Sequence, residues 1–67
     1  MKHIVLSPID DSARRLIRTL LDEAIMERRL DSYAVLVDGT IALRATAQRR
    51  KLVAPLQALG LVEVELS

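Results

Sequence analysis

The sequence predicts an α+β protein in the order strand, helix, strand, strand, helix, strand, the split-βαβ or ferredoxin-like arrangement. Three observations predict it. Residues 11–30 repeat apolar side chains at helical spacing, an Asp-Gly pair divides two apolar runs within residues 33–45, and residues 61–66 alternate apolar and acidic side chains. The chain has 67 residues, 51% of them hydrophobic. This length and composition predict a single folded domain covering 1–67.

The first two elements are a short strand and a long helix. The apolar run at residues 3–6 predicts a buried strand. Ser7 then suits a helix N-cap, Pro8 the first helical position and Asp10 the partner in a capping box. From there to about Leu30, apolar side chains recur at steps of three and four and form one wide stripe. The sequence therefore predicts a long amphipathic helix, roughly 34 Å at 1.5 Å per residue.

A hairpin follows, because an Asp-Gly pair between two runs of β-forming residues favours a two-residue type I′ turn. Pairing about that turn places Leu36 opposite Ile41 on the face that covers the helix. The second face then holds Tyr33, Val35 and Val37. It is more apolar than a solvated face needs to be, so we expect it to contact a second copy of the chain or a partner.

The last two elements are a helix and an edge strand. Thr46 can cap a helix from Ala47, and Pro55 is expected to kink or split it near Ala54, before a glycine stop at residue 60. Residues 61–66 predict a half-exposed strand whose glutamates point outward, as suits an edge. A winged helix fits less well, since no second helix precedes the hairpin. The remaining alternative is a strand-sharing dimer, in which terminal strands pair across subunits.

The composition also predicts the assembly and the compartment. A domain this small with no cysteine has no disulfide, so we expect a homodimer to supply the missing stability. The longest run without a charge, residues 52–62, is too short to span a membrane and contains proline and glycine. No apolar leader is visible at the start of the sequence, and a cytoplasmic protein is expected.

The sequence offers little for catalysis. The only histidine, His3, lies four residues before Ser7 and seven before Asp10, and a nucleophilic site also needs an oriented base and an oxyanion site. The closely spaced acidic residues form only separate pairs, Asp10-Asp11, Asp22-Glu23 and Glu63 with Glu65, and the two glycines lie far apart. We therefore expect a protein that is not an enzyme and has no cofactor and no metal.

Charge patterning identifies the candidate site. Residues 39–62 carry four basic side chains and no acidic one. These four are Arg44, Arg49, Arg50 and Lys51. The last three fall in the first turns of a predicted helix, where the helix dipole disfavours cations. No acidic residue nearby in the sequence offsets this cost, and such a cluster is a candidate functional site. The cluster suits an acidic protein surface or nucleic-acid phosphate, because arginine pairs with both. The plain alternative is a solubilising turn, or pairing with Glu63 and Glu65.

Two functions follow as expectations. The first is a small interaction or regulatory protein that binds a larger protein partner, as an accessory or inhibitor of the kind that phages and plasmids encode. The second is a dimeric nucleic-acid-binding regulator that uses the basic cluster, with Arg14, Arg15 and Arg18 helping. A two-fold dimer would double the cluster and make DNA binding feasible.

Overall fold

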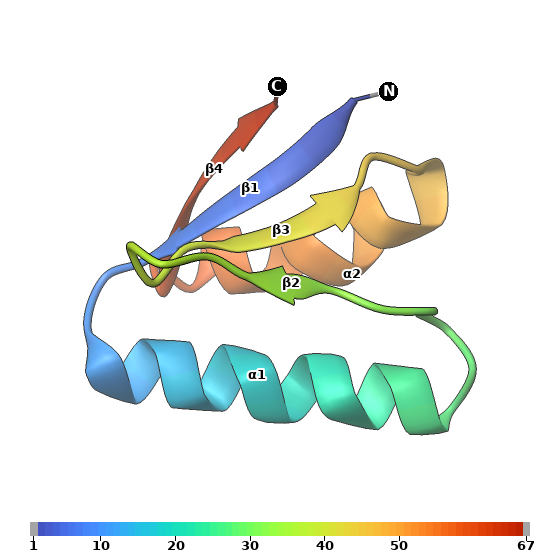
Figure 1. Ribbon diagram of the computed structural model, residues 1–67, viewed down its shortest axis with the longest axis horizontal. Helices are drawn as coiled ribbons and strands as arrows, with labels where there is room; N and C mark the ends of the chain where they lie inside the picture. Colours follow the sequence, from blue (N-terminus) through green and yellow to red (C-terminus); the bar gives the residue numbers. More distant parts are fainter. Residues whose placement is uncertain (1, 67) are drawn as a thin grey trace.

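The computed structural model describes residues 2–66 and has two helices on one side of a four-stranded antiparallel sheet (Figure 1). This confirms the predicted α+β class. The elements are β1 (His3–Pro8), α1 (Asp11–Met26), β2 (Ala34–Val35), β3 (Ile41–Arg44), α2 (Ala47–Ala58) and β4 (Val62–Leu66). The strands lie in the order β2-β3-β1-β4. Because all neighbours are antiparallel, β1 and β2 run parallel with β3 between them, and β3 and β4 run parallel with β1 between them.

The core lies between the sheet and both helices. The sheet contributes alternate residues, which point to one face, whereas their neighbours point to an open face with no helix on it. The helices contribute part of the predicted apolar stripe of α1, in which Leu16 and Leu20 are exposed, and two side chains of α2. The largest fully buried side chains are Ile4, Leu6, Ile17, Leu21, Ile41 and Leu43. Neither helix in residues 2–66 is long and apolar enough to cross a membrane.

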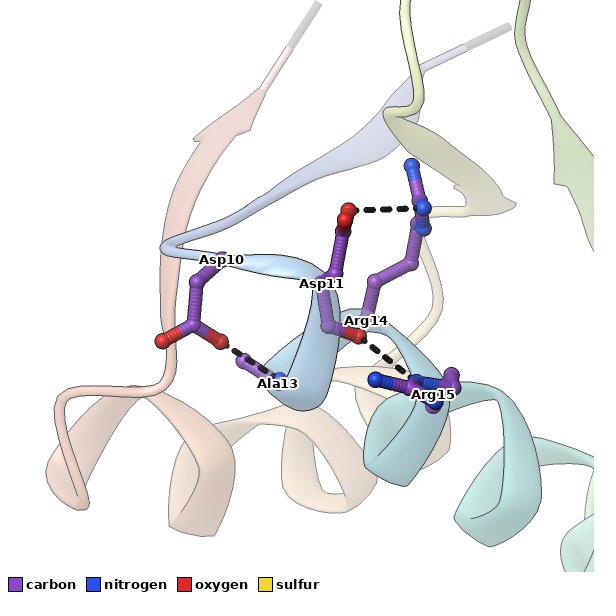
Figure 2. Close-up of polar contacts among 5 residues, drawn as sticks. All are labelled: Asp10, Asp11, Ala13, Arg14 and Arg15. Carbon is purple, nitrogen blue, oxygen red and sulfur yellow. Dashed lines mark hydrogen bonds and ion pairs between the residues drawn. The ribbon is translucent and has the colours of Figure 1, made fainter.

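The helix α1 begins three residues later than predicted, and Asp10 is its N-cap. The Asp10 carboxylate accepts a hydrogen bond from the Ala13 N–H at 2.7 Å (Figure 2). The predicted cap, Ser7, and the predicted first helical residue, Pro8, belong instead to β1, which pairs with β4 as far as Pro8. Pro8 is tolerated there because β3 has already ended on its other side, so its missing N–H breaks no ladder bond.

The end of α1 also differs from the prediction. The helix stops at Met26 and has 16 residues, or about 24 Å, because Arg28 adopts a left-handed φ of 61°. The Arg29 N–H then bonds back to the Ala24 carbonyl at 2.8 Å and the Arg28 N–H to the Ile25 carbonyl at 3.0 Å. This is a Schellman motif with arginine at the position that glycine usually occupies. It turns the chain sharply and directs residues 28–31 towards the start of α2.

The hairpin has a three-residue loop, and its register is one residue away from the prediction. Leu36 donates to the Thr40 carbonyl at 2.8 Å, and Gly39 takes a φ of 87°. This is the turn followed by a left-handed glycine that makes a G1 bulge. The Asp38 carboxylate accepts from the Thr40 hydroxyl at 2.7 Å and the Thr40 N–H at 3.0 Å, which favours the longer loop and lowers the pKa of Asp38. Ile41 therefore lies opposite Val35, and not opposite Leu36.

The helix α2 is continuous from Ala47 to Ala58, so the predicted split near Ala54 is wrong, whereas the alternative, a kink, stays a prediction. Thr46 caps its start, as predicted, by accepting from the Arg49 N–H at 3.2 Å. Pro55 is exposed and costs one intrahelical hydrogen bond, and the helix resumes when the Leu59 N–H bonds to the Pro55 carbonyl at 3.0 Å. Gly60, at a φ of 72°, ends α2 as predicted.

Candidate functional site

The two edges of the sheet differ in how they are protected. The β4 edge carries two exposed glutamates, Glu63 and Glu65, and charges of this kind discourage pairing with a further strand. The opposite edge is formed by β2 and the loop that follows it. From residue 33 to residue 37 this segment contains no charged residue. The edge at β2 therefore has no protecting charge, although its strand is only two residues long.

Three consecutive apolar side chains are exposed along this edge. Val35 is 45% exposed, Leu36 44% and Val37 fully exposed at the tip of the hairpin. We call these three residues the β2 edge. Leu36 bonds to Thr40, and hydrogen bonds alternate along an antiparallel ladder, so the N–H and C=O of Val35 point away from β3. The edge thus offers apolar side chains together with backbone groups that no strand of this sheet pairs.

Tyr33 does not belong to this surface, although the sequence placed it there. Its side chain packs against the core, and its hydroxyl donates to the Asp22 carboxylate of α1 at 2.6 Å. The one-residue change of register explains the difference, since it moves the residues of this segment to the opposite faces. For the same reason Leu36, assigned to the core by the sequence, is half-exposed. Of the predicted face residues, Val35 and Val37 lie at the β2 edge.

The contact with α1 predicts how Tyr33 titrates. Burial, and then the hydrogen bond to Asp22, raise the pKa of Tyr33 above the ordinary value of about 10. Tyr33 is the only aromatic residue, so the ultraviolet absorbance of tyrosinate reports this hydroxyl alone. We expect a pKa above 10 in the folded protein and a value closer to 10 in Asp22→Asn. A wild-type pKa at or below 10 would disprove the packing of Tyr33.

The sign of the accompanying stability change follows by linkage. A tyrosine whose pKa is raised by folding stabilises the protein while it is neutral, below its unfolded pKa. That contribution is lost as pH rises through the folded pKa. Stability should therefore fall above about pH 10, and less steeply in Asp22→Asn, as followed by chemical denaturation at each pH.

A second feature is a cleft of about 320 Å³ where the end of α1, the end of β3 and the start of α2 meet. We call it the arginine cleft. Four arginines line it, and Asp31 is the only acidic residue among its lining residues. The arginines are Arg28, Arg29, Arg44 and Arg49. Thr46 and Gln48 complete the lining from the first turn of α2.

Arg49 is the fixed member of this cleft. Its side chain is only 10% exposed, and its guanidinium donates to the Asp31 carboxylate at 3.1 Å. The Asp31 carboxylate itself is 91% exposed, so the pair holds α2 to the turn after α1 without being sealed from water. At the rim, Arg29 pairs with Glu27 at 2.7 Å. Within residues 2–66, Arg28 and Arg44 make no ion pair.

The four basic residues singled out by the sequence do not share one surface. Arg44 and Arg49 line the arginine cleft, whereas Arg50 lines a hollow against β4 and Lys51 lines a third beside Leu52. Successive residues of a helix point about 100° apart, which separates neighbours in sequence. Sequence reasoning missed Arg28 and Arg29, because it continued α1 past the turn that brings them to the start of α2.

The remaining polar candidates do not converge. His3 and Ser7 are four residues apart on β1, about 13 Å along a strand, and Asp10 is occupied as the N-cap of α1. In the described part of the chain, no three His, Asp or Glu side chains lie close enough together to hold a metal ion. Comparisons with protein-family models, with curated proteins and with solved structures each give no match.

Proposed function

We propose that this chain is a small interaction protein, without enzymatic activity, that acts by binding a larger protein partner through the β2 edge. A single observation carries the proposal: the end of the two-residue edge strand β2 and the two residues after it present three exposed apolar side chains and no charge. Edges of this kind are usually shortened, charged or covered, because they otherwise pair with another chain. In this protein the opposite edge carries glutamates, and the β2 edge does not.

The expected mode of binding is addition of a strand. An extended segment of the partner pairs with the outward N–H and C=O of Val35, and the apolar side chains give it a surface to cover. Val35 lies opposite Ile41 at the margin of the core, whereas Leu36 points to the other face, so both sides of the partner strand meet apolar atoms. A partner segment rich in β-branched residues fits this chemistry best.

We also propose that, without a partner, two copies of the chain pair through the same edge. A two-fold pairing of β2 with β2 satisfies the same backbone groups in both copies and makes a self-complementary interface. It would be one form of the homodimer expected from the sequence, and it differs from the strand-sharing alternative, in which terminal strands pair across subunits. Light scattering at micromolar concentration checks it: a monomer removes the dimer from the account and leaves the partner proposal standing.

The direct test compares an edge variant with a matched surface variant. Val35→Lys combined with Val37→Lys adds two charges to the edge, and Leu59→Lys adds one at a side chain that is 73% exposed near the end of α2. Each tagged protein is used to capture partners from a nuclease-treated lysate of its source cells. Wild type and Leu59→Lys should capture the same protein in stoichiometric amount. The edge variant should capture at least about tenfold less of it.

Circular dichroism of each variant separates lost binding from lost folding, since these side chains are exposed and lysine should not unfold the chain. Equal capture by the folded edge variant would rule out the β2 edge as the docking surface. If only Leu59→Lys lost capture, the partner would bind at the helices and not at the β2 edge.

Two finer predictions remain proposals. We infer that the sheet is the split-βαβ arrangement, supported by its two interleaved pairs of parallel strands. We also propose a cytoplasmic location. Nucleic-acid binding through Arg44, Arg49, Arg50 and Lys51 stays a prediction from the sequence.

A further inference from the structure

We propose that the arginine cleft binds a compact phosphate-bearing ligand, one whose phosphate group enters between Arg28 and Arg44 and meets Arg49 at the base. This inference does not depend on the β2 edge. It rests on four guanidinium groups lining one hollow of about 320 Å³, a volume within the usual range for small-ligand pockets. No other hollow described in residues 2–66 is lined by more than one arginine.

The charge in the cleft is not balanced by the protein. Asp31 pairs with Arg49 and Glu27 with Arg29, which leaves Arg28 and Arg44 without an acidic partner in the described residues. Like charges around a partly enclosed hollow repel one another more than they do in open water. A bound anion with two negative charges removes this repulsion, so it should stabilise the fold as well as bind to it.

The chemistry of the lining favours phosphate among anions. A planar guanidinium matches the oxygens of phosphate in a bidentate geometry, and a phosphate ester carries close to two negative charges at neutral pH. The cleft lies at the start of α2, where the helix dipole adds positive potential, although Thr46 already accepts from the Arg49 N–H. Because Arg49 is buried and held by Asp31, one guanidinium is already in place before the ligand arrives.

The arrangement favours a compact ligand over a nucleic-acid strand. Four arginines line one hollow. Arg50 lines a separate hollow against β4, and Lys51 lines a neighbouring hollow that shares Arg29 and Gln48 with the cleft. Asp31 lines the cleft with a carboxylate that is 91% exposed, and this charge would repel a run of phosphates. The only aromatic residue, Tyr33, donates a hydrogen bond to Asp22 of α1 and does not line the cleft. The cleft therefore has no aromatic side chain on which a base could stack.

The test uses inorganic pyrophosphate as the probe, with the whole chain. Titration calorimetry should give one saturable site, and the midpoint of thermal unfolding should rise by about 5 °C at saturation. The cleft variant combines Arg28→Gln with Arg44→Gln, and the matched control is Arg50→Gln on the same helix. The cleft variant should lose at least about tenfold in affinity, whereas the control stays within about twofold of wild type.

Two further arms distinguish the ligand's source. Inorganic phosphate and a small phosphate monoester should compete with pyrophosphate, which supports a free phosphate-bearing molecule. A short DNA duplex should not compete. The proposal would be overturned in favour of nucleic acid if the duplex competed and if Arg50→Gln and the cleft variant both lost affinity for it equally. A rise in the unfolding midpoint produced equally by sodium chloride of the same ionic strength would reduce the effect to general screening and overturn it too.

Discussion

Leu21→Ala is expected to destabilise the protein by about 3–4 kcal/mol and to leave much of it unfolded at room temperature. Leu21 lies at the centre of the stripe by which α1 covers the sheet, and none of its surface is exposed. Truncating a fully buried leucine removes its transfer free energy and leaves a cavity. A domain of this size has a free energy of unfolding of roughly 3–10 kcal/mol, so this substitution removes a large part of it.

The measurement is the free energy of unfolding from urea denaturation, followed by the helix signal in circular dichroism. Leu59→Ala is the matched control, because the same atoms are removed from a side chain that is 73% exposed. We expect the control to change stability by less than about 1 kcal/mol. Equal effects of the two substitutions would mean that α1 does not pack on the sheet as described.

Pro55→Ala is expected to stabilise the protein by about 1–3 kcal/mol. Proline is roughly 3 kcal/mol less favourable than alanine in a helix interior, and α2 continues past Pro55 for three residues. The substitution restores the missing N–H, which can bond to the Lys51 carbonyl. Pro55 is exposed, so little packing is lost in return. Some of the gain is offset, because alanine gives the unfolded chain more freedom.

The same urea denaturation reports this gain as a higher midpoint with an unchanged slope. Gln57→Ala serves as the control, since it places alanine at an exposed position of α2 that already has its N–H, and it should shift stability by less than about 0.5 kcal/mol. A loss of stability in Pro55→Ala would contradict this account. It would show that the fold requires a distortion of α2 at Pro55.

The periodic parts of the fold could be predicted from the sequence because they depend on local spacing. The stripe of α1, the Thr46 cap, the glycine stop of α2 and the alternation in β4 all follow from which residues share a face. The start of α1 could not be predicted in the same way. Ser7 and Asp10 both suit an N-cap, and pairing of β1 with β4 as far as Pro8 decides between them.

The hairpin shows a second limit of local reasoning. Asp-Gly favours a two-residue turn, yet the Asp38 side chain bonds to Thr40 and supports a three-residue loop. One residue of register exchanges the faces of the whole strand, so Leu36 becomes exposed and Tyr33 turns to α1. Of the residues predicted for the docking surface, Val35 and Val37 are exposed, and Val35 lies opposite Ile41 on the side of the sheet that faces the helices.

The arginine cleft could be predicted only in part, because it depends on where a helix ends. Arg44 and Arg49 stood out through their lack of acidic neighbours in the sequence. Arg28 and Arg29 fall inside the helix that the sequence predicts to continue to about Leu30, and only the left-handed turn at Arg28 brings them to α2. Nothing in the local sequence marks that turn, since glycine is absent from it.

Amide hydrogen exchange along β2 tests the central claim, that the β2 edge is an open strand that receives a partner. At a protein concentration too low for two copies to pair, the account predicts slow exchange at the Leu36 N–H, which bonds to Thr40, and fast exchange at the Val35 N–H, which points outward. On addition of the captured partner, Val35 should become protected while Leu36 stays as it was. Slow exchange of Val35 in the free monomer, with fast exchange of Leu36, would contradict the account, since the edge would then present the wrong residues to a partner.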